Sequence, residues 1–164
     1  MKSLTGPRER HDETETVERD VESCVSQICE EARMVLPGVQ ALFGFQLIAV
    51  FNQTFHDLSV PLKELHIFAI ALIVVCICLL MTPAAYDRQT GTYKITRHFA
   101  KMSSTLLTVA LLPLAVALSC EVGLVTKMAI DRDHLAFIMG GGTLVLLLGA
   151  WYIFPRIAHH LGIK

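Results

Sequence analysis

Residues 103–125 read SSTLLTVALLPLAVALSCEVGLV, a run of 23 residues whose single charged side chain is Glu121. The hydrocarbon core of a bilayer is about 30 Å thick, and about 20 helical residues are needed to cross it. This run is long enough and apolar enough to do so. It therefore predicts a transmembrane helix.

Three further runs have the composition of membrane spans. They cover residues 35–51, 65–81 and 135–154. The first is the most polar, and its three companions favour the membrane interpretation for it as well. We therefore predict an all-α integral membrane protein with four transmembrane helices. Pro83 and Pro155 are expected to mark helix ends.

Composition excludes several other classes of protein. The chain has 164 residues, 53% of them apolar, with a mean hydropathy of +0.52. Its net charge is −1, and it has no broad basic face for nucleic acid. The five cysteines form no CxxC pair, so neither a disulfide framework nor a zinc site is expected. Residues 1–34 lack the apolar core of a signal peptide and are expected to be retained.

The N-terminal segment, residues 1–34, carries 5 basic and 9 acidic side chains. From about residue 14, apolar or small residues recur with helical spacing, which predicts an amphipathic helix leading into the first span. The positions are Val17, Val21, Cys24, Ile28, Ala32 and Val35. Three roles stay open for this helix: a coiled coil with another protomer, packing on the basic loop after the second span, or contact with the membrane surface.

The distribution of Lys and Arg predicts the orientation. With four spans, the N-terminal segment, the middle loop and the tail of residues 156–164 share one side, which carries eleven basic residues against three on the other. Because positively charged segments stay in the cytoplasm, both termini are expected there. Four residues are expected to anchor the inner interface, namely Arg33, Arg88, Trp151 and Tyr152.

Small and amide side chains within the spans predict helix packing. Small residues let helix backbones approach closely in lipid, and amides are poorly placed against acyl chains. The predicted packing positions are Gln40, Gly44 and Gln46 in the first span, Ser104, Thr108, Ala115 and Ser119 in the third, and Gly142 and Gly149 in the fourth. One four-helix protomer leaves some of these faces uncovered, so a homo-oligomer or a membrane-complex partner is expected.

Glu121 is the acidic residue found inside a predicted span, and buried ionisable groups in membranes are costly and often functional. It lies about one turn from the outer end, where an interfacial or helix-pairing role is the alternative. His66, His134 and Asp131 gather on that same side, and the four residues form a candidate ion or proton site. Their spacing matches no metal-ligand signature, so no metal and no cofactor is expected.

Two motifs carry a resemblance to a known family. Residues 31–43 read EARMVLPGVQALF, and residues 82–88 read TPAAYDR. They resemble an uncharacterised bacterial family of small four-span membrane proteins, a domain of unknown function. Its members share an E-x-R-x4-GVQ-x-LF start and an AP-x-A-x-x-R step after the second span, where this chain has Thr82 before the proline. Some members bear a sodium:proton antiporter label, and the resemblance implies a bacterial cytoplasmic membrane but no catalytic residue.

Two functions follow as expectations. The first is a non-enzymatic, self-associating four-helix membrane protein or membrane subunit, because no catalytic motif is present. The second is a proton-coupled cation transporter or ion-conducting oligomer that uses Glu121 as its titrating group.

Overall fold

The computed structural model of the chain describes residues 7–90 and 97–160, and every element in them is a helix. The elements are α1 (Pro7–Ala49), α2 (Gln53–His56), α3 (Val60–Thr90), α4 (Arg97–Ile130), α5 (Asp133–Leu148), the π-helix η1 (Gly149–Ile153) and α6 (Phe154–His160). Four helical stretches are long and apolar enough to span a membrane: Ser26–Ala49, Val60–Tyr86, Phe99–Ile130 and Asp133–Ile157. The prediction of an all-α protein with four transmembrane helices is confirmed.

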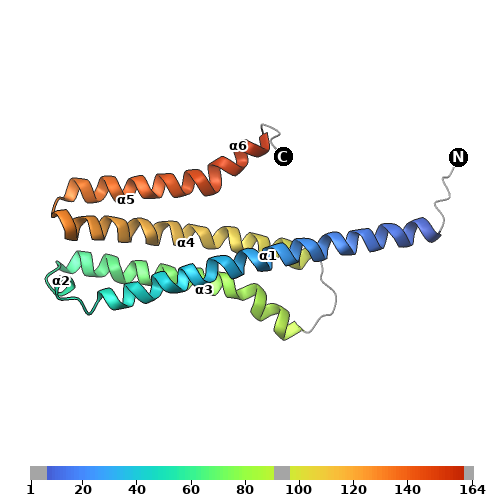
Figure 1. Cartoon of the computed structure of the whole chain (residues 1–164), viewed down its shortest axis with the longest axis horizontal. Helices are drawn as coiled ribbons and strands as arrows, with labels where there is room; N and C mark the ends of the chain where they lie inside the picture. The colour runs from blue at the N-terminus through green and yellow to red at the C-terminus, as the bar shows by residue number, and fades with distance from the viewer. Residues whose placement is uncertain (1–6, 91–96, 161–164) are drawn as a thin grey trace.

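The first span and the amphipathic segment form one helix. α1 begins at Pro7, earlier than the expected residue 14, and a proline in the first turn costs no helical hydrogen bond. The helix continues through Pro37 and projects beyond the other helices (Figure 1). Ile28 and Val35 of the predicted apolar face pack into the bundle. The side chains of Val17, Val21 and Cys24 and the loop at residues 91–96 lie outside the described residues.

The expectation that Pro83 and Pro155 end helices is wrong. α3 continues past Pro83 to Thr90, and Figure 1 shows it bending near this end. A proline inside a helix lacks the N–H donor and displaces a carbonyl of the preceding turn, so it bends the helix without stopping it. Pro155 lies in the first turn of α6, directly after η1, and the helical path continues there too.

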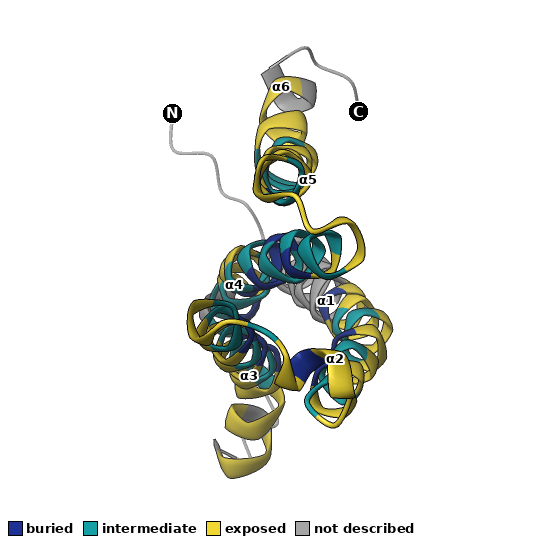
Figure 2. Cartoon of the chain, turned by 90° about the vertical axis from the view of Figure 1, so that its left-hand side faces the viewer, coloured by how far each residue is buried: buried dark blue, intermediate teal, exposed yellow. Residues whose placement is uncertain are grey.

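The long helices lie side by side with α4 in the middle. Viewed end-on, α1, α3 and α4 surround the axis of the bundle, while α5 packs on the outer side of α4 (Figure 2). We call the end where α2 joins α1 to α3 the α2 end, and the opposite end the α6 end (Figure 1). Because α5 has α4 as its principal neighbour, its attachment depends on that single contact.

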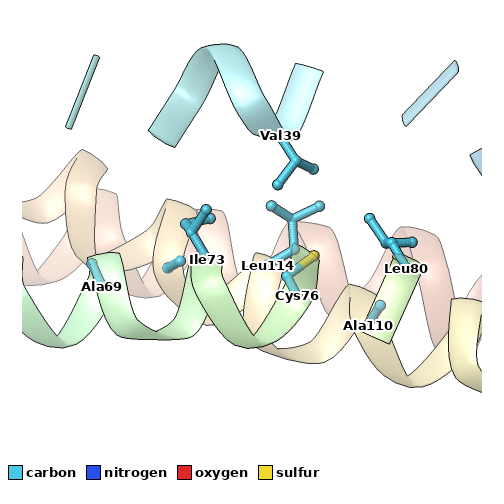
Figure 3. Packing of buried hydrophobic residues seen from close by; sticks show 8 residues of the cluster. Val39, Ala69, Ile73, Cys76, Leu80, Ala110 and Leu114 are labelled. Carbon is cyan, nitrogen blue, oxygen red and sulfur yellow. The ribbon is translucent and has the colours of Figure 1, made fainter. Parts of the chain in front are cut away.

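The middle of the bundle is apolar. Figure 3 shows Val39 of α1 reaching toward the buried side chains of α3 and α4. Small residues let α3 and α4 approach closely, and the larger side chains fill the space toward α1. The cluster consists of Val39, Ala69, Ile73, Cys76, Leu80, Ala110, Leu114 and Ala117. Between its two ends, the described core of this protomer is therefore apolar.

The close approach of α4 and α5 occurs at Gly123 and Gly140. A Cβ atom added to Gly140 would lie 2.9 Å from the carbonyl oxygen of Ser119, and one added to Gly123 would lie 3.3 Å from that of Ala136. The predicted seam at Gly142 and Gly149 is therefore wrong within this chain, since a Cβ at either meets nothing within 4 Å. At 100° per residue these two positions point away from the face that holds Gly140.

Only half of the predicted small-residue strip of the third span is buried in a helix contact. Ala115 and Ser119 are buried, whereas Ser104 and Thr108 are exposed. The exposed pair lines a cavity of about 320 Å³ between α1 and α4, where the two helices do not meet closely. The strip is thus a contact face toward the α2 end and an open face toward the α6 end.

Candidate proton site

Three polar side chains from three helices meet near the α2 end. Glu121 of α4 accepts a hydrogen bond at Oε1 from the side-chain amide of Gln46 on α1, at 3.0 Å. The same Oε1 atom lies 2.9 Å from Nδ1 of His66 on α3. His66 is 1% exposed, Gln46 3%, and the Glu121 side chain 15%. The cluster of Gln46, His66 and Glu121, which we call the polar triad, is therefore inside the protein.

Local structure explains how the triad is enclosed. Gln46 lies in the last turn of α1, and His66 lies in the second turn of α3, so the connection between these helices brings the two together. This connection contains the short helix α2, whose N-cap Asn52 accepts a hydrogen bond from the Thr54 amide at 3.0 Å. The buried ring of Phe55 in α2 meets the His66 ring edge-on, with centroids 5.1 Å apart. Phe55 thereby covers the imidazole from the α2 end.

The hydrogen-bond network assigns the protons of His66. Its Nε2 atom lies 3.0 Å from the backbone carbonyl oxygen of Gln46, which can only accept, so Nε2 carries a proton. Nδ1 faces a carboxylate oxygen, and two lone pairs at 2.9 Å would repel each other. A proton on either His66 or Glu121 removes this repulsion. The contact between Nδ1 and Oε1 lacks the geometry of a hydrogen bond, and it is an ion pair only when the imidazole is protonated.

One acceptor of the triad has no partner. The Oε1 atom of Gln46 is buried and accepts no hydrogen bond among the described residues. The triad thus brings an imidazole and a carboxylate, two groups that can carry a proton, into contact, and it also ties three helices together. Both roles depend on the same short contacts.

Two residues of the triad were grouped in the sequence analysis. His66 and Glu121 belong to the predicted ion or proton site and are in contact. Gln46 was predicted as a packing residue, and Phe55 was not part of the predicted site. The sequence held one signal for Gln46, because its amide lies near the end of the first predicted span, at the depth expected for His66 and Glu121.

The other two predicted site residues lie elsewhere. His134 is exposed in the first turn of α5. Asp131 is exposed between α4 and α5, with a positive φ of 53°. Its Oδ1 atom lies 2.8 Å from Nζ of Lys127, which also contacts Asp133 at 2.9 Å, and the ammonium group lowers the pKa of Asp131. These residues form a charged surface turn and do not join the triad.

The described residues contain no group of three or more His, Cys, Asp or Glu side chains that could hold a metal ion.

The four predicted interface anchors divide into two kinds. Arg33 and Arg88 are exposed, as an anchor in the headgroup region would be. Trp151 packs against the apolar core, and the hydroxyl of Tyr152 donates to the carbonyl of Thr108. The two aromatic residues thus fasten η1 to α4.

The sequence that forms this site matches a known protein family. The family of unknown function DUF6328 matches residues 12–155. The chain belongs to this family. The DUF6328 match covers all four spans and every residue of the triad, and it confirms the resemblance to an uncharacterised family of small four-span membrane proteins. No curated protein and no solved structure is significantly similar to this DUF6328 chain.

Proposed function

We propose that the protein is a non-enzymatic membrane protein that self-associates, or serves as a membrane subunit, through the outer face of α1. The observation that carries this proposal is Gln40, an amide that is exposed in the middle of the first span. An amide without partners is costly in lipid, because hydrocarbon supplies neither donors nor acceptors. Gln40 therefore needs a polar partner from outside its own protomer.

The surroundings of Gln40 suit a second copy of the chain. Gly44 lies one turn further along the same face, and a Cβ there would meet nothing within 4 Å, so another backbone can approach closely. Pro37 and Ala41 are also exposed, and their short side chains leave room for a neighbouring helix. A glutamine both donates and accepts, so two copies related by a twofold axis can pair Gln40 with Gln40.

A single orientation in the membrane makes such pairing parallel. We propose that both termini face the cytoplasm in the bacterial inner membrane, because eleven basic residues lie on the side of the termini and three on the other. The same bias argues against antiparallel pairs, in which half of the copies would have to insert against it. α1 of one copy then meets α1 of the next in the same direction.

Self-association is tested by molecular mass in mild detergent. We expect the wild-type protein to be oligomeric and Gln40→Leu to weaken its association by about fivefold, since a hydrogen bond between membrane helices contributes roughly 1 kcal/mol. Gln53→Leu is the matched control, because Gln53 is exposed in α2, outside the spans. A monomeric wild-type protein, or equal effects of the two variants, would refute the proposal.

A second function is favoured by the triad. Proton-coupled cation exchange or conduction needs a group that binds a proton inside the membrane, and the His66–Glu121 contact of 2.9 Å provides one. The apolar core of the protomer separates the triad from the α6 end. In this proposal the ion path therefore runs between protomers, and the triad supplies the proton-binding step.

Ion and proton flux in proteoliposomes tests this second function. We expect Glu121→Gln to abolish flux, because the amide keeps the shape of the carboxylate but cannot exchange a proton with His66. Glu64→Gln is the control, since Glu64 is exposed on α3 near the same end. Equal flux in wild type and Glu121→Gln would exclude Glu121 from the mechanism, and no flux from any variant would argue against transport.

A further inference from the structure

A cavity of about 250 Å³ lies toward the α6 end, between α1, α3 and α4. Its walls are mostly apolar and include Ile28 of α1, Leu80 of α3 and Leu107 of α4. Pro83, the proline inside α3, also lines it, and α3 bends toward this end (Figure 1). Because the bend turns the end of α3 off the straight path of the bundle, it leaves space that a straight helix would fill.

The cavity lies at the expected boundary of the membrane. Phe99, on its α4 wall, is the first residue of the third span. Arg88, on its α3 wall, follows two residues after the end of the second span at Tyr86. Cys29 of α1 lies in the first turn of the first span. The three helices thus place the cavity at the level of lipid headgroups and ester linkages.

A buried hydroxyl without a partner lines this cavity. Ser103 is 1% exposed, and its Oγ atom makes no hydrogen bond among the described residues. Two neighbours on the same helix behave differently, since Thr105 and Thr108 each donate to the carbonyl four residues earlier, at 2.8 and 2.9 Å. The Ser103 hydroxyl does not make that local bond. Because buried polar groups are almost always hydrogen-bonded, we expect a ligand in the cavity to supply its partner.

The second polar group of the cavity is a cation. Arg88 makes no ion pair with any described residue, and its guanidinium is exposed at the mouth. Guanidinium groups bind phosphate through two parallel hydrogen bonds. A ligand that matches the whole cavity therefore has an anionic phosphate, a polar linkage behind it and an apolar chain.

We propose that this cavity binds an anionic membrane phospholipid, with its phosphate on Arg88, its ester region at Ser103 and the upper part of an acyl chain between α1, α3 and α4. Basic pockets between membrane helices commonly recognise anionic headgroups in this way. A free phosphate ion shares the chemistry of the headgroup but would leave the apolar walls uncovered, so the lining favours the lipid.

The test is lipid retention, measured by native mass spectrometry of the full chain released from vesicles of phosphatidylglycerol and phosphatidylcholine in equal amounts. We expect wild type to retain phosphatidylglycerol preferentially and Arg88→Gln to retain about fivefold less of it, as expected for the loss of one basic contact. Arg33→Gln is the matched control, because Arg33 is exposed near the same level on α1 and does not line the cavity.

Ser103 supplies a second, independent readout. Ser103→Ala removes the contact with the ester region, which both lipids possess, so retention of both should fall, while Ser104→Ala, outside this cavity, should leave it unchanged. The proposal is overturned if Arg88→Gln and Arg33→Gln lose phosphatidylglycerol equally, or if wild type retains the two lipids equally. If added inorganic phosphate alone displaces the lipid, the cavity is a site for a small anion and not for a lipid.

Discussion

Glu121→Leu is expected to lower the free energy of unfolding by about 3 kcal/mol, because removal of the carboxylate leaves two buried polar side chains without their partner. The His66 ring, 1% exposed, would lose its contact with Oε1 at 2.9 Å. The amide of Gln46 would lose its hydrogen bond of 3.0 Å as well. Three helices would thus be loosened at one point.

The measurement is equilibrium unfolding in mixed micelles, with Glu64→Leu as the control. Glu64 is exposed on α3 near the same end, so its replacement should change stability by less than about 0.5 kcal/mol. A double-mutant cycle between His66→Leu and Glu121→Leu should give a coupling energy of at least about 1 kcal/mol. Equal effects of Glu121→Leu and Glu64→Leu would show that the triad contributes nothing to stability.

Replacing all three members of the triad separates stability from proton binding. In the variant Gln46→Leu, His66→Leu, Glu121→Leu no buried charge is left without a partner, and apolar side chains of similar size can fill the space. We expect this variant to recover much of the lost stability while showing no proton-coupled flux. A variant that recovers both would remove the triad from any proton-dependent activity.

The spans were predictable because span length and apolarity are local properties of the chain. Three of the four predicted runs fall within a helical stretch long enough to cross the bilayer, and the first run, residues 35–51, extends two residues past the end of its helix at Ala49. The ends of the helices were less predictable, as Pro83 shows: a proline can stop a helix or bend it, and here α3 continues to Thr90. The stacked rings of Tyr86 and Phe99, with centroids 5.9 Å apart, connect α3 to α4 three residues after this proline.

The triad was predictable only in part, because contact among three helices depends on how each is rotated about its axis. His66 and Glu121 could be grouped from their shared side of the membrane. Helical spacing puts Gln46 and Gln40 on different faces of α1, but it does not show which face turns toward His66 and Glu121 and which turns outward. Asp131 and His134 share the side but sit on exposed connecting turns.

The glycines of the fourth span illustrate the same limit. Small residues occur on opposite sides of α5, with Gly140 on one side and Gly142 on the other. Both sides satisfy a rule based on spacing alone. The structure selects Gly140, because the face that it shares meets Gly123 and Ser119 of α4.

The same substitution should therefore have opposite effects at these two glycines. We expect Gly140→Ala to lower the free energy of unfolding by about 2 kcal/mol, because its Cβ would lie 2.9 Å from the backbone oxygen of Ser119 and the helices would have to separate. Gly142→Ala should leave stability unchanged or raise it by up to about 1 kcal/mol, because alanine favours the helix and its Cβ meets nothing within 4 Å.

The difference between the two alanine variants reports on the attachment of α5, since α4 is its principal neighbour. Hydrogen exchange should become faster along α5 in Gly140→Ala and stay unchanged along α3, which does not touch this seam. If exchange instead rises equally in all helices, the seam is part of the global core. If Gly142→Ala is the more damaging variant and also lowers the oligomeric mass, the outer face of α5 is a contact between protomers, and the seam at Gly140 is not what holds α5 in place.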